Sequence, residues 1–459
     1  MNYTRRTWLT VAGAVGFSAA LTRCGGGDPL SPTATDAASA PLADAARSTR
    51  TAPTVVKSTT GRVVIVGGGM AGMAAAKYLR VWGGSGVQVT LLERNASYTS
   101  NILSNLVLTG QRTLSSLVYS YATAKQAYGI DIQQGDVTAI DSTNRTVTVA
   151  GRTTPLQYDR LIVAPGVVFE DLPGLGTPEA KDRVVHAWQA GPETTKLRNQ
   201  LVAMPDGGTF VMTIPAAPYR CPPGPYERAC VVADWLMRNK PKSKIIVLDA
   251  NPWPTAERHT FETAFKGIFA NVLTYVPNVE ISSIDAGGTR VVVHTVMQGD
   301  VVGDVVNAIP PQRAGKVVLE NGLAPGGLWA PVKPATFEST VAAGVHVIGD
   351  SCSTASAVLP AGVPKAGHIG NQEGKTAADA IIRAFRGLAP DTDVVINSAC
   401  YSPITASTAS WLTAVYQYDA SGNGYRMVNA PASEATNPTA DGYQDMNTWF
   451  NTLMGETFA

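Results

Sequence analysis

Few residues of this chain could hold a metal ion or a covalently attached haem. The sequence has five cysteines and five histidines in 459 residues. The cysteines form no Cys-x-x-Cys or Cys-x-x-Cys-His motif, which excludes a zinc knuckle, a thioredoxin-type pair and a covalent haem. The histidines show no paired spacing of the kind that metal sites use, and we therefore expect no bound metal.

The chain also lacks an excess of charge and a long hydrophobic run. Its 36 Lys and Arg residues nearly balance 35 Asp and Glu residues, which argues against nucleic acid or an anionic membrane surface as a partner. The apolar run at residues 9–21 is too short to span a bilayer, so we expect no transmembrane segment. Arg5 and Arg6 precede this run, a pattern typical of the Tat export route, and we expect a periplasmic protein. Cys24 follows, but Arg23 before it makes a lipid anchor the less favoured alternative.

The remaining length is sufficient for several domains. A chain of 459 residues exceeds what one hydrophobic core usually organises. Residues 25–60 are rich in Ala, Ser, Thr and Pro and show no apolar period. We therefore expect residues 1–60 to form a Tat-type signal and a disordered linker, and the globular fold to begin at Gly61.

A dinucleotide-binding motif lies at the start of the globular region. The β-branched run at residues 62–66 leads directly into GGGMAG at residues 67–72, and an Ala-rich helix is expected over residues 73–81. A second strand at residues 87–92 ends in Glu93, which completes the strand–helix–strand context that a lone glycine motif lacks. The glycines let a pyrophosphate approach the N-terminus of the helix, and the Glu93 carboxylate can accept hydrogen bonds from a ribose.

Two later strands favour FAD over NAD as the dinucleotide. Residues 344–350, GVHVIGD, form a strand that ends in Gly-Asp, where Asp350 can hold a ribityl chain. Residues 158–166, YDRLIVAPG, resemble the strand that closes an FAD domain before the chain crosses to the next one. The candidate cofactor-binding residues of this domain are Gly67, Gly69, Gly72, Glu93, Arg94, Val137, Ala164, Gly166 and Asp350.

The strand–helix–strand pattern occurs a second time, at residues 209–214, 226–237 and 244–249. In NAD(P)H-dependent disulfide reductases the loop after the first of these strands is rich in glycine. Here residues 215–225 read PAAPYRCPPGP, and prolines lack the N–H groups that a phosphate needs. We therefore expect no nicotinamide nucleotide in this domain, which leaves the cysteines as an alternative route for electrons. Four follow the signal in a chain whose export would allow a disulfide to persist, namely Cys221, Cys230, Cys352 and Cys400.

Several segments resemble the flavoprotein subunit of flavocytochrome c sulfide dehydrogenase. They are CPPGPYER at residues 221–228, IPPQRAG at 309–315, TFES at 336–339, CYS at 400–402 and the closing aromatic segment at 449–458. The likeness extends from about residue 61 to the C-terminus. It implies an α/β fold with two Rossmann-like dinucleotide-binding domains, similar to glutathione reductase, and a small α+β C-terminal domain that covers the flavin.

The resemblance also implies the domain boundaries. The FAD-binding domain would comprise residues 61–173 and 315–388. The second Rossmann-like domain would comprise residues 174–314, and the C-terminal domain residues 389–459.

The resemblance further implies how the site works. In that family a disulfide lies beside the flavin ring, and its cysteines map to Cys221 and Cys400. Sulfide can attack one sulfur to give a persulfide, and the released thiolate passes electrons to the flavin. Glu227 matches the candidate acid/base of the family, although it could instead be a helix-terminal charge paired with Arg228. Lys365 maps near the flavin pyrimidine ring, where a cation would stabilise the anionic reduced form.

One position departs from the family pattern. Where the family attaches FAD through a cysteine thioether, this chain has Asn101, so we expect non-covalent FAD. Cys230 and Cys352 are interpreted as small buried residues or a structural pair. The expected substrate is sulfide or a related small sulfur compound, and the expected partner is a c-type cytochrome subunit in a heterodimer.

Three alternatives remain open. A sulfide:quinone oxidoreductase shares the fold and chemistry but needs an apolar C-terminal surface, whereas this C-terminus is polar throughout. A non-catalytic sulfur carrier has no physical reason to keep Cys221, Glu227 and Cys400 together. An NAD(P)H-dependent disulfide reductase is disfavoured by the proline-filled loop.

Overall fold

The computed structural model describes residues 59–428 and 430–459. Residues Thr59–Ala459 form one compact unit. The predicted export signal and linker, with the twin arginines and Cys24, lie outside the described residues apart from Thr59 and Thr60. Within the described part of the chain, no helix combines the length and hydrophobicity that a membrane span requires.

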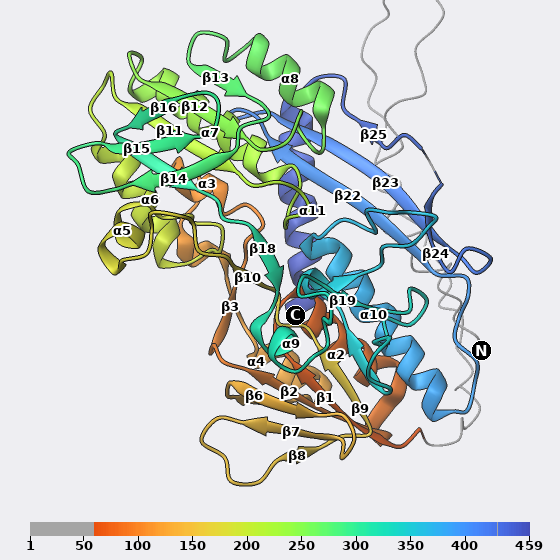
Figure 1. Cartoon of the computed structure of the whole chain (residues 1–459). Helices are drawn as coiled ribbons and strands as arrows, with labels where there is room; N and C mark the ends of the chain where they lie inside the picture. Colours follow the sequence, from red (N-terminus) through yellow and green to blue (C-terminus); the bar gives the residue numbers. More distant parts are fainter. Residues whose placement is uncertain (1–58, 429) are drawn as a thin grey trace, which may run out of the picture. The chain divides into compact units, whose positions relative to one another are not determined.

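A five-stranded parallel sheet forms around the glycine motif, in the order β20-β9-β1-β2-β5 (Figure 1). Because such a sheet is covered on both faces, its central strand is apolar on both sides, as the β-branched run of β1 predicts. The helix α2, Met70–Gly83, follows β1 and begins three residues before the predicted start. The strands are β1 Gly61–Val66, β2 Val87–Glu93, β5 Asp131–Gln134, β9 Arg160–Val163 and β20 Val345–Val347.

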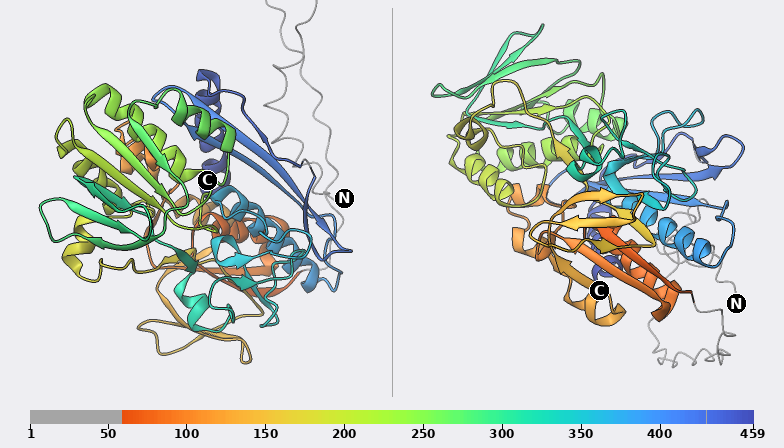
Figure 2. Two further views of the ribbon diagram at one scale, coloured as in Figure 1. Left: turned by 45° about the horizontal axis from the view of Figure 1, so that its top comes forward. Right: turned by 60° about the horizontal axis from the view of Figure 1, so that its bottom comes forward.

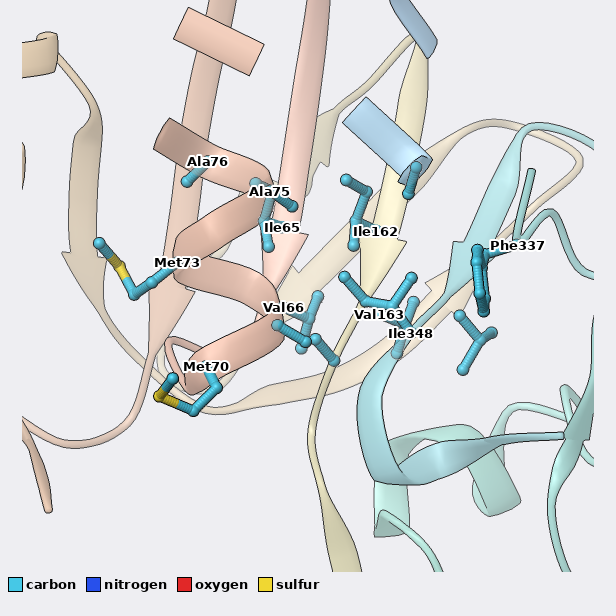
Figure 3. Close-up of a cluster of buried hydrophobic side chains, with 14 of the residues drawn as sticks. Ile65, Val66, Met70, Met73, Ala75, Ala76, Ile162, Val163, Phe337 and Ile348 are labelled. Atoms are coloured by element: carbon cyan, nitrogen blue, oxygen red, sulfur yellow. The ribbon is translucent and has the colours of Figure 1, made fainter. Parts of the chain in front are cut away.

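The core of this sheet joins segments that lie far apart in the sequence. Figure 3 shows side chains of β1 and α2 packed with those of β9 and with Phe337 and Ile348. Each of the labelled side chains is at most 6% exposed. Residues near position 340 therefore complete a core that begins at residue 61. The labelled residues are Ile65, Val66, Met70, Met73, Ala75, Ala76, Ile162, Val163, Phe337 and Ile348.

The helix α10, Gly367–Phe385, packs directly against α2. A Cβ atom on Gly374 would lie 2.4 Å from the carbonyl oxygen of Ala71 and 2.9 Å from the backbone nitrogen of Ala75. A Cβ atom on Gly367 would lie 3.3 Å from the Met70 side chain. Glycines thus let the two helices touch through their backbones, and this contact brings their N-termini to the same place.

A second parallel sheet, in the order β13-β12-β11-β17, repeats the arrangement. Its strands are β11 Thr209–Ile214, β12 Lys244–Asp249, β13 Leu273–Val276 and β17 Val305–Ala308. The helix α7, Gly224–Asn239, connects β11 to β12 and is longer than predicted at both ends. The chain passes to and from this sheet through β10, Val167–Phe169, and β18, Gln312–Ala314, which pair antiparallel. The predicted α/β fold with two Rossmann-like sheets is confirmed.

The C-terminal region is an antiparallel sheet covered by a long helix. Figure 2 shows its strands in blue from two further sides, beside the green helices of the second sheet. The helix α11, Ala440–Phe458, ends with Phe458 stacked 4.8 Å from the ring of Tyr98. The strands are β22 Val395–Pro403, β23 Ala409–Asp419, β24 Gly424–Met427 and β25 Ser433–Glu434. The predicted domain boundaries stay predictions, since Thr59–Ala459 form a single compact unit.

Shorter elements connect these sheets. The antiparallel sheet β14-β15-β16 contacts the second parallel sheet through β16. The remaining elements are η1 Gly84–Gly86, β3 Ser97–Thr99, α3 Asn105–Leu108, η2 Leu114–Leu117, β4 Val118–Ser120, α4 Ala122–Tyr128, β6 Val137–Asp141, β7 Thr146–Val149, β8 Leu156–Gln157, α5 Pro178–Arg183, α6 Pro192–Ala203, α8 Arg258–Lys266, β14 Ile281–Asp285, β15 Val291–Thr295, β16 Asp300–Gly303, α9 Lys316–Glu320, β19 Ala330–Pro331, η3 Gly349–Ser351 and β21 Cys352–Ser353.

The contact between α2 and α10 predicts the effect of a single methyl group. Gly374→Ala should lower the free energy of unfolding by about 1–3 kcal/mol, because the new Cβ overlaps backbone atoms that cannot move aside. Gly455→Ala in α11 is the matched control, since no atom lies within 4 Å of the added Cβ. It should stabilise the protein by up to about 1 kcal/mol, because alanine favours the helix. Urea midpoints of both variants measure this, and an unchanged midpoint for Gly374→Ala would contradict the packing.

Candidate active site

The glycine motif forms a tight turn at the N-terminus of α2. Gly67 has a φ of +99°, and a Cβ atom there would lie 2.3 Å from the carbonyl oxygen of Ala164. A Cβ atom on Gly72 would lie 1.9 Å from the carbonyl oxygen of Gly67. Around Gly69, by contrast, the nearest atom belongs to Tyr98, at 3.9 Å. The first and third glycines are therefore required by packing, and the second leaves room for a pyrophosphate beside the helix N-terminus.

Glu93 lies at the edge of this turn. Its carboxylate accepts hydrogen bonds from the backbone nitrogens of Gly68, at 2.7 Å, and Asn95, at 2.9 Å. Arg94 is exposed at the surface, and Val137 is buried at the start of β6. Glu93 thus stands between the glycine loop and the end of β2, where the ribose of a dinucleotide would bind.

Asp350 provides a second indication that a cofactor fits here. Burial raises the pKa of its carboxyl, while the charges of Arg220 and Lys365 act in the opposite direction. No hydrogen bond from the described residues reaches this carboxylate. Nearby, Gly166 has a φ of +77° and accepts a hydrogen bond from the Ser351 hydroxyl. A partly buried acceptor without a partner fits the hydroxyl groups of a ribityl chain.

Lys365 and Asn101 both hold backbone segments. The Lys365 ammonium group donates to the carbonyl oxygen of Cys352 at 2.6 Å and lies 3.8 Å above the centre of the Trp329 ring. Burial lowers its pKa, and the negative charge of nearby groups partly offsets this. The Asn101 amide oxygen accepts a hydrogen bond from the Ala190 nitrogen at 2.7 Å. Asn101 therefore fixes the segment that leads into α6.

The loop that contains Cys221 follows β11 of the second sheet and reaches the residues just before α10. The Cys221 nitrogen donates to the carbonyl oxygen of Lys365 at 2.8 Å, immediately before α10. Cys221 itself has a φ of +60°, a left-handed conformation that is uncommon outside glycine. A Cβ atom on Gly224 would lie 2.8 Å from the Cys221 sulfur. The glycine of the CPPGP segment is therefore needed where this sulfur packs against α7.

Cys221 and Cys400 are both partly buried and lie close enough for the charge of Cys221 to affect Cys400. Burial raises the pKa of Cys221 to about 12, and the charge of Glu227 adds to the effect. Burial also raises the pKa of Cys400 well above its ordinary value, and the charges of Cys221 and Glu257 add to it. All four cysteines of the described residues are free in this structure. Because a thiol with a raised pKa is a poor nucleophile, these two sulfurs are better suited to be attacked than to attack.

Cys230 and Cys352 lie apart from this pair. They are buried in two different hydrophobic clusters, that of the second sheet and that of the first. The two side chains do not form a structural pair, which leaves the interpretation as small buried residues.

A network of buried side chains holds Glu227. Its Oε1 atom accepts a hydrogen bond from the Asn105 amide nitrogen at 2.9 Å. Arg228 does not form an ion pair with Glu227, because it donates to the Asn105 oxygen at 2.8 Å, to Asn307 and to the Ala187 carbonyl. Burial raises the pKa of Glu227 to about 8, although the Asn105 hydrogen bond lowers it. The sequence gave no signal for Asn105, since a single asparagine 122 residues away from its partner forms no pattern.

Asp249 lies at the end of β12, the position that Glu93 takes in the first sheet. It is fully buried and accepts hydrogen bonds from the hydroxyls of Tyr226, at 2.8 Å, and Tyr275, at 2.7 Å. The backbone nitrogen of Asn251 donates to its other oxygen at 2.9 Å. The carboxylate is therefore satisfied by its own chain, which leaves little capacity to bind the ribose of a second dinucleotide. Within the described residues, no group of three or more His, Cys, Asp or Glu side chains could hold a metal ion.

The fold occurs in several solved flavoproteins and related reductases. The sulfide:quinone oxidoreductase of the hyperthermophilic bacterium Aquifex aeolicus superposes with a TM-score of 0.68 at 16% identity, over 86% of this chain and 91% of that one. An NAD-dependent persulfide reductase from A. fulgidus gives 0.58 at 15% identity, over 86% and 77% of the two chains. Putidaredoxin reductase, in its covalent complex with putidaredoxin, gives 0.61 at 16% identity, over 86% and 93%. At these identities the likeness shows the fold alone.

Two family models match the sequence itself. Residues 61–208 match the model for pyridine nucleotide-disulphide oxidoreductases. Residues 194–310 match the model for the central part of the sulfide dehydrogenase (flavocytochrome c) flavoprotein chain. The second match includes the Cys221 loop, Glu227 and Asp249. Together the two matches cover residues 61–310 and support the assignment of the chain to the FAD-dependent pyridine nucleotide-disulphide oxidoreductases.

Proposed function

We propose that this protein oxidises sulfide, or a related reduced sulfur compound, through a disulfide between Cys221 and Cys400, and passes the electrons to a c-type cytochrome. The observation that carries the proposal is the proximity of these two partly buried cysteines to each other and to the buried Glu227. The Cys221 loop is bonded to Lys365, which neighbours Asp350 and the N-terminus of α10. The cysteines would therefore lie beside a flavin whose ribityl chain Asp350 binds.

In the proposed reaction the disulfide of Cys221 and Cys400 receives the sulfur of the substrate, and atoms and electrons balance. Hydrosulfide attacks one sulfur of the disulfide, so that one sulfur–sulfur bond breaks, another forms, and a persulfide and a thiolate result. When these two close to a trisulfide, the cysteine pair loses two electrons and one proton. FAD, when bound, takes up the two electrons and the proton as FADH⁻. The raised pKa values of both thiols favour this direction, because the closed pair carries no buried negative charge.

Glu227 is proposed as the acid/base group that relays the persulfide proton. A carboxyl with a pKa of about 8 holds a proton near neutral pH and gives it up at little cost, which suits a group that relays protons. Asn105 donates to Oε1, and Arg228 fixes the Asn105 amide in the orientation that allows this. Arg228 and Asn105 are thus positioning residues for Glu227.

A cytochrome acceptor is favoured over a quinone. A quinone enzyme needs an apolar surface that enters the membrane. The large exposed apolar side chains of the described residues include none from α11. The proposal places a c-type cytochrome subunit next to this chain in a heterodimer, and the match to the flavoprotein chain of flavocytochrome c sulfide dehydrogenase supports it. The FAD would be non-covalent, because Asn101 offers no thiol, and the twin arginines near the N-terminus would direct export to the periplasm.

The first test of the proposal is the anaerobic addition of stoichiometric sulfide to the protein with FAD bound. The flavin absorption of the wild-type protein should bleach, whereas Cys221→Ser and Cys400→Ser should bleach at least about a hundredfold more slowly, because neither can form the disulfide. Cys230→Ala is the control, since this cysteine lies inside α7, in the hydrophobic cluster of the second sheet and outside the Cys221 loop, and should leave the rate unchanged. A wild-type flavin that stays oxidised despite bound FAD would exclude sulfide as the donor.

The acceptor is tested on the protein reduced in this way. A c-type cytochrome should reoxidise the flavin in one-electron steps at a rate that falls with ionic strength, as for charged partners. A short-chain quinone should be slower. NADH should not bleach the flavin, because Asp249 is already satisfied and the adjacent loop is filled with prolines. Rapid bleaching by NADH would favour the reductase alternative, and rapid oxidation by quinone would favour the quinone enzyme.

Glu227 should also affect how the free energy of unfolding changes with pH. Its folded pKa is about 8, above an unfolded value near 4.3, so it stabilises the folded state below pH 4 and this stability is lost as the pH rises to about 8. Glu227→Gln removes this loss while keeping the hydrogen bond to Asn105. Between pH 4.5 and pH 8.5 the variant should gain of the order of 4 kcal/mol relative to the wild type. Urea midpoints at both pH values measure the difference, and parallel curves would show that Glu227 is not buried in this way.

A further inference from the structure

We propose that Glu257 is a second proton-handling residue of this site, which transfers protons between the Cys400 side of the cysteine pair and solvent near Glu434. The inference rests on the proposed function, because it concerns the proton that sulfide oxidation releases. It is carried by the position of Glu257, by one unsatisfied carboxylate oxygen, and by a row of polar side chains on the C-terminal sheet.

Glu257 occupies a conformation that glutamate seldom adopts. It lies just before α8 with a φ of 48° and a ψ of 43°, in the left-handed region that favours glycine or asparagine. Its residue exposure is only 2%. A strained backbone that places a carboxyl group in the interior is a combination found more often at functional sites than elsewhere.

The carboxyl group of Glu257 is only half satisfied. Its Oε1 atom accepts a hydrogen bond from the Ser402 hydroxyl at 2.6 Å. Its Oε2 atom is buried and has no hydrogen-bond partner. An ordinary structural carboxylate at this depth would have both oxygens bonded, because an unsatisfied buried acceptor is costly. The free oxygen can instead accept and release a proton.

The sheet beside Glu257 places Cys400 and Glu434 on the same face. Cys400 pairs with Leu412 of β23, and Leu412 pairs with Glu434 of β25, so the three side chains form one row across the strands. The next row on this face is Ser402 with Ser410, two residues along each strand. Since Ser402 bonds to Glu257, that carboxyl group lies against the face that carries both Cys400 and Glu434.

The charged surroundings of Glu257 contain acids and thiols rather than cations. Glu227 and Cys230 face it from α7, Cys400 faces it from β22, and Glu434 faces it from β25. Burial, together with the charge of Glu434, raises the pKa of Glu257 to about 7, and the hydrogen bond from the Ser402 hydroxyl partly opposes this rise. The carboxyl group therefore changes its protonation state near neutral pH, as a proton relay requires.

Glu434 connects this buried group to the surface. It is partly exposed, and its Oε1 atom accepts a hydrogen bond from the backbone nitrogen of the exposed His259 at 3.1 Å. Its Oε2 atom is buried without a partner, like that of Glu257. The hydroxyls of Ser410 in β23 and Thr260 in α8 are 3.2 Å apart. They therefore connect the C-terminal sheet with the helix that follows Glu257. The C-terminal strands and α8, which carry these residues, lie beside one another in Figures 1 and 2.

The reaction releases one proton in each turnover, and Glu257 would transfer it. Hydrosulfide loses two electrons and one proton on its way to sulfur at the oxidation level of the element. Because a one-electron acceptor would finally take the electrons without the proton, one proton must reach solvent in each turnover. Glu227 is buried beside the Cys221 loop, and Glu257, through the partly exposed Glu434 near it, supplies the continuation towards the surface on the Cys400 side.

The test compares Glu257→Gln with Glu262→Gln, an exchange on the same helix at a partly exposed carboxylate that is paired with Arg258 and Lys266. In anaerobic stopped-flow mixing with sulfide, Glu257→Gln should reduce the flavin about tenfold more slowly at pH 7 and should lose one ionisation near neutral pH from its rate profile. Glu262→Gln should match the wild type. Ser402→Ala should shift the same ionisation to higher pH, because it removes a hydrogen bond that favours the carboxylate.

A second measurement does not depend on sulfide. Infrared difference spectra of the oxidised protein across a pH titration should contain a protonated-carboxyl band that disappears near pH 7. The band should lose the contribution of one carboxyl group in Glu257→Gln but not in Glu262→Gln, whereas the buried Glu373, whose pKa is also raised to about 7, contributes to it in every variant. Exchange of a purely structural glutamate would change neither the band nor the rate profile, only the thermal midpoint.

The outcomes separate the two proposals. If sulfide bleaches the wild-type flavin but Glu257→Gln keeps the wild-type rate and profile, the role of Glu257 is overturned and the proposed function stands. If the wild-type flavin does not respond to sulfide, both fail. If the infrared band is the same in Glu257→Gln as in the wild type, the role of Glu257 is overturned whatever sulfide does.

Discussion

The backbone hydrogen bond from Cys221 to Lys365 joins the two halves of the candidate site. One half is the glycine turn with Asp350, which exists because α2 and α10 touch through Gly374. The other half is a loop of the second sheet, which can reach α10 because Cys221 adopts a left-handed conformation. Without this bond, the reactive sulfur would have no fixed position relative to the cofactor pocket.

Burial, rather than pairing with cations, sets the pKa values of the acids and thiols on the protein side of the site. Cys221, Cys400, Glu227 and Glu257 all lie in a region where removal from water raises the pKa of every acid. The one buried cation among them, Arg228, is bonded to amide and carbonyl oxygens rather than to a carboxylate. The region therefore favours neutral forms, namely a closed disulfide and protonated carboxyl groups, and binds a proton wherever a negative charge would otherwise accumulate.

The sequence predicted the buried strands better than anything else. The strands at residues 62–66, 87–92, 209–214 and 244–249 agree with the structure to within one residue, because a strand covered on both faces reads as a continuous apolar run. The helix starts were less accurate, since α2 begins in a glycine-rich turn and α7 in a proline-rich loop, and neither segment carries an apolar period. Cys221, Cys400 and Glu227 were identified only through a family resemblance. Asn105 and Glu257 were missed, because each acts through partners more than a hundred residues away.

The shared core of the first sheet has a consequence for how the chain folds during synthesis. Strands β1, β2 and β9 emerge from the ribosome early, but β20 and Phe337, which complete their core, follow after the whole of the second sheet. The second sheet is made from one continuous stretch and can close by itself. The first sheet keeps an uncovered apolar edge until almost two hundred further residues have been synthesised. Such a delayed, long-range closure folds slowly and exposes the nascent chain to aggregation, so this half of the molecule is where a chaperone would be needed.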